Sequence, residues 1–228
     1  MNKERFTRSI GLIGEDSFSS FKDKTICIIG LGGVGGTAFE SLLRTGFSNF
    51  ILIDMDVVAE SNLNRQILYT THDLGEYKVV AAKNRALSIN EEANISLLNI
   101  KIYNDSIHEL DKYNIDFIVD AIDNLEGKIA ISEYALFNNI PHIVSLGMAN
   151  RFNPCDVYIT RLDKTTNDPL AKKFRHILRS KNMATNFINV VCSKELPLSF
   201  NGKLNSIMNV PSSAGLAISY YVINYFRG

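Results

Sequence analysis

The sequence lacks several features that whole classes of protein need. Its 228 residues have no net charge, because 24 Lys and Arg balance 24 Asp and Glu. A uniformly basic nucleic-acid-binding protein is therefore excluded, although a local basic patch is not. With 46% hydrophobic and 21% charged residues, the composition is that of an ordinary folded protein rather than a disordered one. We expect one domain, large enough to bury its own core.

Cysteines and long apolar runs are also scarce. The three cysteines, Cys27, Cys155 and Cys192, form no CxxC pair, which favours a reducing compartment and no structural zinc. Residues 1–18 contain no apolar signal core. The most apolar late stretch, residues 214–226, is too short to span a bilayer. These absences predict a cytoplasmic enzyme or binding protein without a membrane segment.

Short apolar runs alternate with helical patterns along the first two thirds of the chain. These runs predict strands at 25–30, 50–53, 95–100, 116–121 and 142–147. Between them, helices are predicted up to Leu43 and at 76–90, 105–112 and 125–139. Nearly continuous apolar strands that alternate with helices indicate a mainly parallel sheet covered on both faces. We therefore predict an α/β fold of the doubly wound, Rossmann-like type.

The pattern changes after residue 150. Further strands are predicted at 156–161 and 187–193, and further helices at 169–181 and 212–226. We therefore divide the single domain, residues 1–228, into two parts. Residues 1–150 form the nucleotide-binding part, and residues 151–228 form the substrate-side part.

A glycine-rich turn follows the first predicted strand. Residues 30–35, GLGGVG, fit the GxGxxG pattern between a strand and a helix. The glycines allow close backbone approach to a phosphate, and the helix N-terminus offers free N–H groups. Asp54 ends the next strand, 19 residues after Gly35, where it can accept hydrogen bonds from ribose hydroxyls. The pattern indicates an adenine nucleotide but leaves NAD and ATP open.

The residues that follow Asp54 favour a triphosphate. Arg65, in the stretch SNLNRQ, and Lys78 supply the positive charge that would stabilise a leaving pyrophosphate. Asp123 follows a strand at the sheet edge where open α/β folds bind ligands, and a carboxylate there suits Mg²⁺. Asp120 either faces the same cleft or caps the next turn.

The order of these motifs is typical of one superfamily. The matching pieces are RFTR at 5–8, GLGGVGG at 30–36, LIDMD at 52–56, SNLNRQ at 61–66, GEYK at 75–78 and DAIDN at 120–124. In them the chain resembles the ubiquitin-activating-enzyme-like adenylating proteins, which include the ThiF, MoeB and HesA enzymes. The resemblance implies their adenylation fold, binding of ATP and Mg²⁺, and adenylation of a carboxylate. It places on the nucleotide Gly30, Gly32, Gly33, Gly35, Asp54, Asp56, Asn62, Asn64, Arg65, Lys78 and Asp123.

The resemblance also implies individual roles. It places Asp54 on the ribose and Asn62, Arg65 and Lys78 on the phosphates. It makes Asp123 the ligand of Mg²⁺. It further implies a homodimer in which a residue near the N-terminus reaches into the neighbouring subunit's site. The residues to which it gives catalytic roles are Arg65, Lys78, Asp123 and Arg8.

The second half resembles one branch of the superfamily, the tRNA threonylcarbamoyladenosine dehydratases, over residues 163–183 and 210–226. The resemblance implies activation of the threonyl carboxylate of a modified adenosine in tRNA, followed by ring closure with net loss of water. Residues 161–185 contain no cysteine, and the chain has no CxxC pair for zinc. Both features favour this branch over an activator of a ubiquitin-like sulfur carrier. Cys155 and Cys192 are then interpreted as small packing residues.

Three other functions stay open. The first is adenylation of a ubiquitin-like sulfur carrier, which uses the same site. The second is an NAD-dependent oxidoreductase, against which Arg65 and Lys78 argue. The third is a regulatory protein that binds the nucleotide without turnover. A sulfur-transfer protein of the cysteine desulfurase system is a further candidate partner.

A basic segment stands out within the neutral total. Residues 161–181 carry a net charge of +5, so the rest of the chain carries −5. Asp168 is a predicted N-cap and Pro169 a first helical residue. The predicted buried stripe consists of Leu170, Phe174, Ile177 and Leu178. For contact with tRNA phosphates we predict Lys172, Lys173, Arg175 and Arg179. The alternative is a solvated helix face. The stretch from Lys194 to Ser206 is expected to be compact.

Overall fold

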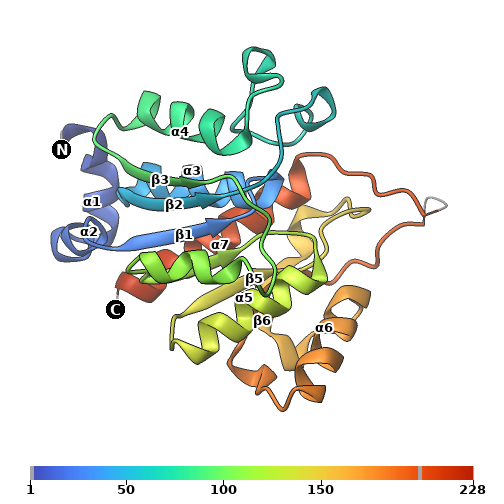
Figure 1. Ribbon diagram of the computed structural model, residues 1–228. Coiled ribbons are helices and arrows are strands. Elements are labelled where there is room, and N and C mark those ends of the chain that lie inside the picture. The colour runs from blue at the N-terminus through green and yellow to red at the C-terminus, as the bar shows by residue number, and fades with distance from the viewer. Residues whose placement is uncertain (1–2, 200–201, 228) are drawn as a thin grey trace.

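Seven strands form one sheet in the computed structural model, which describes residues 3–199 and 202–227 (Figure 1). The strands are β1 (Thr25–Ile29), β2 (Asn49–Ile53), β3 (Asn94–Leu98), β4 (Phe117–Asp120), β5 (His142–Ser145), β6 (Val157–Arg161) and β7 (Asn189–Ser193). Their order across the sheet is β3-β2-β1-β4-β5-β7-β6. All neighbours are parallel except β6 and β7, which pair antiparallel. The predicted strands and the mainly parallel sheet are confirmed.

Helices cover both faces of this sheet. The α-helices are α1 (Thr7–Ile13), α2 (Glu15–Phe21), α3 (Gly33–Thr45), α4 (Lys78–Ile89), α5 (Leu125–Phe137), α6 (Pro169–Ser180) and α7 (Asn209–Arg227). Short 3-10 turns are η1 (Lys3–Phe6), η2 (Glu60–Asn62), η3 (Thr71–Asp73), η4 (Ile107–Lys112), η5 (Pro154–Asp156), η6 (Leu162–Lys164) and η7 (Thr185–Phe187). Among the described residues, no helix combines the length and apolarity needed to cross a membrane.

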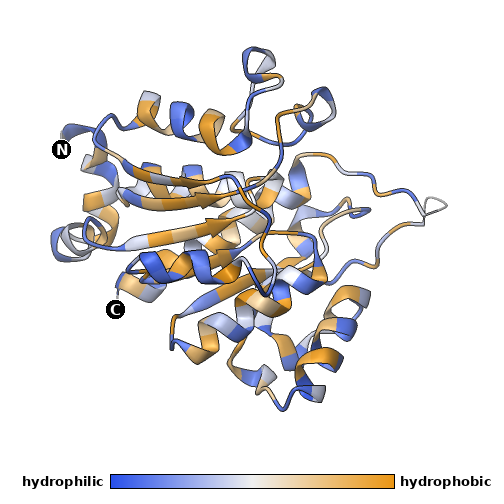
Figure 2. Cartoon of the chain, in the orientation of Figure 1, coloured by the Kyte–Doolittle hydropathy of each residue, from blue (hydrophilic) through white to orange (hydrophobic). Residues whose placement is uncertain are grey.

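Alternate residues of the strands pack into separate cores on the two faces. In β1, Ile26 and Ile28 join the core under α3 and α7, while Cys27 and Ile29 join the core under α5. The strands are accordingly the most continuously apolar part of the chain (Figure 2). Helix α7 lies directly along α3, where a Cβ on Gly215 would come within 2.5 Å of the Val34 carbonyl oxygen. Glycine at this position therefore allows the two helices to approach closely.

The strand order reverses direction between β1 and β4. After β1 the chain continues to β2, and after β4 it continues to β5, on the opposite side. The loops that follow β1 and β4 therefore diverge at the carboxyl ends of these two neighbouring strands. Such a switch point is where doubly wound folds bind ligands. The N and C marks both lie near the amino ends of the strands (Figure 1). The fold thus leaves one open end of the sheet for a site.

Two glycines of the first loop are required by close packing. Gly30 has a φ of 91°, and a Cβ there would lie 2.8 Å from the carbonyl carbon of Ala121. A Cβ on Gly35 would lie 1.9 Å from the carbonyl oxygen of Gly30. A side chain at either position would push apart the loops that follow β1 and β4. These glycines therefore set the geometry of the switch point.

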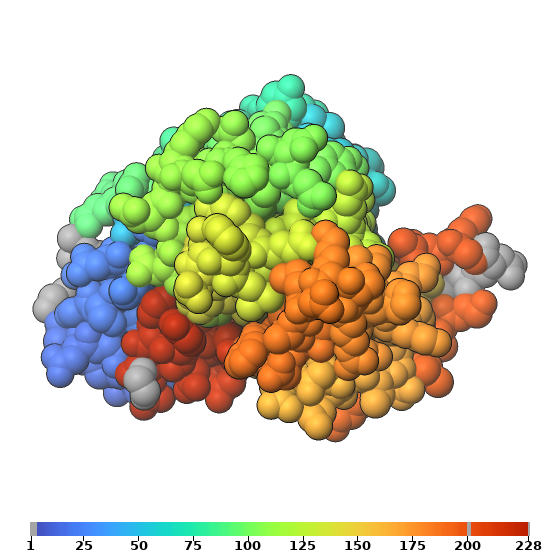
Figure 3. Space-filling model, turned by 60° about the horizontal axis from the view of Figure 1, so that its bottom comes forward, coloured from blue at the N-terminus to red at the C-terminus, as the bar shows by residue number. Residues whose placement is uncertain are grey.

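Some predictions of local structure differ from the fold. Helices α1 and α2 had not been predicted, and the expected helix at 105–112 is the 3-10 turn η4. Helix α7 begins at Asn209 rather than 212, because Pro211 is tolerated in a first helical turn. The expectation of a compact stretch at 194–206 is wrong. Residues 194–199 and 202–208 extend from the body as two arms (Figures 1 and 3).

Candidate nucleotide-binding site

A cavity of about 710 Å³ lies at the switch point, between the loops that follow β1 and β4. Asp123 enters it from the β4 loop. The other predicted nucleotide residues that line it are Gly30, Gly32, Gly33, Asp54, Asp56, Asn62, Arg65 and Lys78. Gly35 and Asn64 do not line it. Gly35 lies within the first turns of α3, and the Asn64 amide donates to the Ser206 carbonyl oxygen at 2.9 Å. The structure therefore gathers most of the predicted set in one place.

The phosphate loop is held by the end of β2. The Asp54 carboxylate accepts hydrogen bonds from Leu31 N at 2.7 Å and from Asp56 N at 2.9 Å. The buried Tyr69 hydroxyl donates to the Leu31 carbonyl oxygen at 2.9 Å. Burial, together with the Asp54 charge, raises the pKa of Tyr69, so the phenol stays a hydrogen-bond donor. Each Asp54 oxygen keeps a second lone pair, which suits a ribose hydroxyl.

Two cations face the phosphate side of the cavity. Lys78 is buried, and its Nζ donates to Asp56 Oδ2 at 2.7 Å. The Arg65 guanidinium donates through Nη1 to the Ser61 carbonyl oxygen and to Asn64 Oδ1, both at 2.8 Å. These bonds orient the two side chains before any ligand arrives. The arrangement can stabilise negative charge that develops on a departing phosphate group.

The two aspartates after β4 have different surroundings. Asp120 is fully buried, and its Oδ1 accepts from Lys128 Nζ at 2.9 Å and from Ile122 N at 3.2 Å. Burial raises the pKa of Asp120. The capping interpretation is therefore the one that the structure supports for Asp120. Asp123 is exposed and lines the cavity.

A metal ion here would depend on a ligand as well as on protein. In the part of the chain that the structure describes, no three or more His, Cys, Asp or Glu side chains gather as a metal site. Asp123 offers an exposed carboxylate that lines the cavity. Mg²⁺ binds in just this way, through one or two carboxylates together with phosphates and water. The donors fit Mg²⁺ that arrives with a nucleotide.

Gln66 and Arg151 line the cavity, although the sequence did not predict them as site residues. Gln66 is 6% exposed, and its Oε1 has no hydrogen-bond partner among the described residues. An orphaned buried acceptor that lines a cavity suits a ligand donor. Arg151 is 5% exposed and donates to the carbonyl oxygens of Gly147 at 2.9 Å and Ser193 at 3.2 Å. It also donates to the Glu195 carbonyl oxygen. For Gln66, the available signal was its place next to Arg65 in SNLNRQ.

Arg151 also joins the cavity to the basic helix. Its Nη2 donates to Asp168 Oδ2 at 3.2 Å in a buried ion pair. Asp168 Oδ1 in turn accepts from Ala171 N at 2.9 Å, so the predicted N-cap of α6 is confirmed. Asp168, Pro169 and Leu170 line the cavity. The first turn of α6 is therefore part of the site.

The exposed face of α6 differs from its prediction at two residues. Lys172, Lys173 and Arg179 are exposed. Arg175 is half-buried, and its Nη1 donates to the carbonyl oxygens of Leu162 at 3.2 Å and Thr165 at 3.1 Å. Its guanidinium thus ties α6 to the first residue of η6 and to the residue that follows this turn. Leu170 belongs to the cavity wall rather than to a buried stripe.

Arg8 and the cysteines lie outside the cavity. Arg8 is an exposed side chain on α1, and it does not line the cavity of its own chain. Its role across a subunit interface stays a prediction. Cys192 is buried in β7, as expected for a packing residue. Cys155 is exposed at η5, so its interpretation as a packing residue is wrong.

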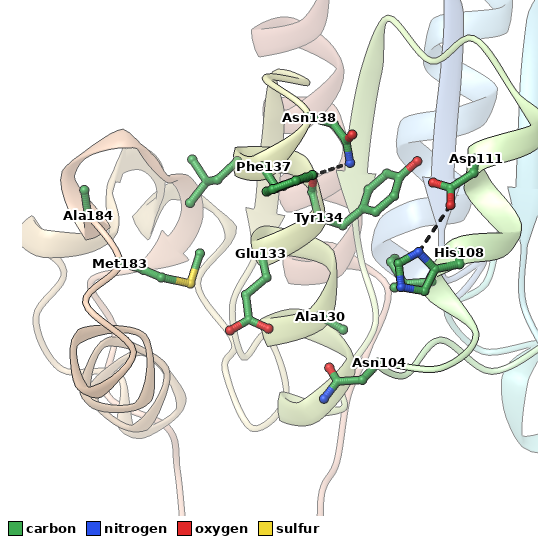
Figure 4. Close-up of a pocket in the computed structure, with 12 residues that line it drawn as sticks. Asn104, His108, Asp111, Ala130, Glu133, Tyr134, Phe137, Asn138, Met183 and Ala184 are labelled. Carbon is green, nitrogen blue, oxygen red and sulfur yellow. Dashed lines mark hydrogen bonds and ion pairs between the residues drawn. The ribbon is translucent and has the colours of Figure 1, made fainter.

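A second depression of about 820 Å³ runs along α5, between η4 and the segment after α6 (Figure 4). His108 Nδ1 lies 3.2 Å from Asp111 Oδ2 on one side, and Met183 lines the other. Phe137 is 86% exposed there. None of the predicted nucleotide residues lines this depression. The cavity at the switch point is therefore the candidate site.

The fold and the site together define an adenylation domain of one family. The chain belongs to the ThiF family, whose match spans residues 6–173. Its sheet and helices are those of the ThiF and MoeB adenylation fold, as predicted.

Two named relatives and one solved structure show which proteins of the family this chain is similar to. The tRNA threonylcarbamoyladenosine dehydratase of Escherichia coli (strain K12) is 35% identical over 178 residues, which cover 78% of this chain and 66% of that protein. The Bacillus subtilis (strain 168) protein of the same name is 32% identical over 85% of this chain and 76% of its own length. A crystal structure of the E. coli enzyme in complex with ATP matches with a TM-score of 0.92 at 30% identity, over 98% of this chain and 94% of that one.

Proposed function

We propose that the protein is an ATP-dependent tRNA threonylcarbamoyladenosine dehydratase. The observation that carries the proposal is the convergence of Arg65, Lys78 and Asp123 on the cavity behind the phosphate loop. A nicotinamide dinucleotide has no leaving pyrophosphate, so it gives these charges no role. The relatives that bear this dehydratase name support the choice of substrate.

The first proposed step joins the threonyl carboxylate to the α-phosphate of ATP. The carboxylate oxygen attacks phosphorus, the bond to the β-phosphate oxygen breaks, and pyrophosphate leaves. Arg65 and Lys78 stabilise the charge that develops on this leaving group. The N-terminus of α3 and the loop N–H groups hold the phosphates, and Asp54 holds the ribose. Asp123 would hold Mg²⁺, which supplies additional positive charge at the phosphates.

The second proposed step needs no nucleophile from the protein. A nitrogen of the substrate's own carbamoyl linkage attacks the activated carbonyl and gives up its proton to solvent, a ring closes, and AMP leaves with the former carboxylate oxygen. The net change in the nucleoside is the loss of one water. Because both reacting groups belong to one molecule, proximity provides much of the rate. Within the described residues, no cysteine lines the cavity, which agrees with this route.

The proposal includes partners and location. We propose that tRNA lies on the exposed cations of α6, Lys172, Lys173 and Arg179, and that the enzyme works in the cytoplasm. We also propose a homodimer in which Arg8 of one subunit reaches the other subunit's cavity. Mixing Arg8→Ala subunits with Lys78→Ala subunits tests this, because only a shared site regains activity in the mixed dimer. A sulfur-transfer protein of the cysteine desulfurase system is a further proposed partner, supported by the family resemblance alone.

Mass spectrometry of tRNA nucleosides tests the function directly. Modified tRNA is incubated with the protein, ATP and Mg²⁺, and its nucleosides are then analysed. We expect threonylcarbamoyladenosine to lose the mass of one water, with one AMP formed for each ring closed. An unchanged nucleoside alongside AMP formation stimulated by a ubiquitin-like carrier would instead identify a sulfur-carrier activator. Tight NADH binding without ATP binding would identify an oxidoreductase.

A further inference from the structure

Segments from both parts of the chain line the cavity. We call the phosphate loop and the charged residues described above its inner half. Four apolar lining residues come from the loop after β5, the first turn of α6 and the two arms, and we call them the outer wall, namely Met148, Leu170, Pro197 and Leu204. Leu204 is 80% exposed at the rim. Because Leu170, Pro197 and Leu204 line the cavity together, they offer an apolar surface to a bound ligand.

The substrate of the proposed function has a group that matches this wall. The threonyl carboxylate is attached through N6 of a purine, and it must reach the α-phosphate in the inner half. A base within a nucleic-acid stack cannot bring its substituent into a cavity, so enzymes that act on bases extrude them. An extruded purine loses its stacking neighbours and needs an apolar surface in their place.

We propose that the outer wall is the subsite that receives the extruded purine of the substrate nucleotide. This inference rests on the proposed function. The purine lies against Leu204 and Pro197 on one side and Leu170 on the other, with its N6 substituent directed inward. An activator of a protein carrier would have no purine to place there, so the wall distinguishes the two chemistries.

The position of Leu170 supports a nucleotide rather than a free base. Leu170 lies in the first turn of α6, and the exposed Lys172 and Lys173 follow it on the same helix. Residues three apart in a helix are neighbours on its surface, over a rise of about 4.5 Å, so Lys173 lies on the side of Leu170. The phosphates that flank an extruded nucleotide can therefore contact Lys173. Figure 3 shows α6 on the same side of the molecule as the extended arms.

Asn150 holds the outer wall in place. It has a φ of 59° and lies at the base of the two arms. Its carbonyl oxygen accepts from Leu198 N at 2.7 Å, and its backbone N donates to the Asn205 carbonyl oxygen at 2.8 Å. Its side chain donates to the Lys203 carbonyl oxygen at 3.0 Å and accepts from Asn205 N at 2.7 Å. Asn150 is therefore a positioning residue for Leu204.

Two leucines of the arms provide a matched test. Leu204 lines the cavity, whereas Leu196 is 64% exposed and does not. Neither Leu204→Ala nor Leu196→Ala removes buried packing. We expect Leu204→Ala to raise the KM for modified tRNA about tenfold, because the variant loses apolar surface that the purine would bury, and to leave the Kd for ATP unchanged. Leu196→Ala should match the wild type in both measurements.

A second variant separates position from contact. Asn150→Gly keeps the left-handed backbone but removes both side-chain hydrogen bonds. It should raise the KM for tRNA in the same direction without weakening ATP binding. Equal behaviour of Leu204→Ala and Leu196→Ala, with active wild type, would overturn the purine subsite. A wild type that dehydrates no modified tRNA would refute the proposed function instead.

Discussion

Substitution of Gly32 by alanine should separate folding from nucleotide binding. Gly32 is the N-cap of α3, with an extended backbone (φ −75°, ψ −157°) that alanine can adopt. The nearest atom to a Cβ there would be Gln66 Nε2, at 4.0 Å. The protein itself therefore accommodates the methyl group, and we expect unfolding free energy to change by less than about 1 kcal/mol.

The same methyl group would occupy the space that a phosphate needs. If it prevents two charged hydrogen bonds from loop N–H groups, each worth about 1.5 kcal/mol, binding weakens by about 3 kcal/mol. That is roughly a hundredfold increase in the Kd for ATP. Isothermal titration calorimetry with ATP and Mg²⁺ measures the affinity, and thermal unfolding of the same sample measures stability.

Gly35→Ala provides the contrast, because its Cβ would lie 1.9 Å from the Gly30 carbonyl oxygen. This variant should lose about 3 kcal/mol of stability from overpacking alone. If Gly32→Ala binds ATP with unchanged affinity, the phosphates do not lie against this loop and the assignment of the site is refuted.

Four further outcomes follow from the site and the core. Lys78→Ala should abolish pyrophosphate release without unfolding the protein. If this variant still released pyrophosphate, Lys78 would have no catalytic role. Asp123→Asn should raise the Mg²⁺ concentration needed for half-maximal activity, whereas an unchanged requirement would place the metal elsewhere. Lys173→Glu should lower the salt dependence of tRNA binding by about one unit of log–log slope. Lys112→Glu, on η4, should leave this slope at its wild-type value. If the two variants gave equal slopes, α6 would be a solvated helix face without tRNA contact. Burial lowers the pKa of His142 from 6.5 to about 4. The unfolded chain therefore takes up the proton first, and stability should fall by about 3 kcal/mol as the pH drops from 6.5 to 4. Chemical denaturation at several pH values measures this loss, which His142→Gln should remove.

The nucleotide half of the site was predictable because its residues follow strands directly. Asp54 and Asp123 each come just after an apolar run, and parallel strands bring such positions to one edge. The same logic placed the phosphate loop. What it could not place was Gln66 or Arg151, since their roles depend on which distant segments fold against them. The contacts of Arg151 lie at the ends of β5 and β7 and at the N-cap of α6.

The substrate half was less predictable for a related reason. Helical periodicity assigned Arg175 to an exposed face, but the guanidinium is long enough to bend toward the carbonyl oxygens of Leu162 and Thr165. The arms, residues 194–199 and 202–208, contain no periodic pattern, and hydrogen bonds with Asn150 hold them at their base. Local sequence carries little information about a segment that another part of the chain holds in place.

The packing of α7 along α3 also determines when the site can form. Helix α7 follows all seven strands in the chain, yet Pro211 at its start touches the phosphate loop, where a Cβ on Gly33 would lie 3.1 Å from the proline Cβ. During synthesis, α3 emerges from the ribosome more than 150 residues before this partner. Its apolar face must stay uncovered, or be covered by other contacts, until then. We therefore expect the site to be complete only when Asn209–Arg227 has folded against α3, and ATP should protect chains that include α7 better than chains that end before it.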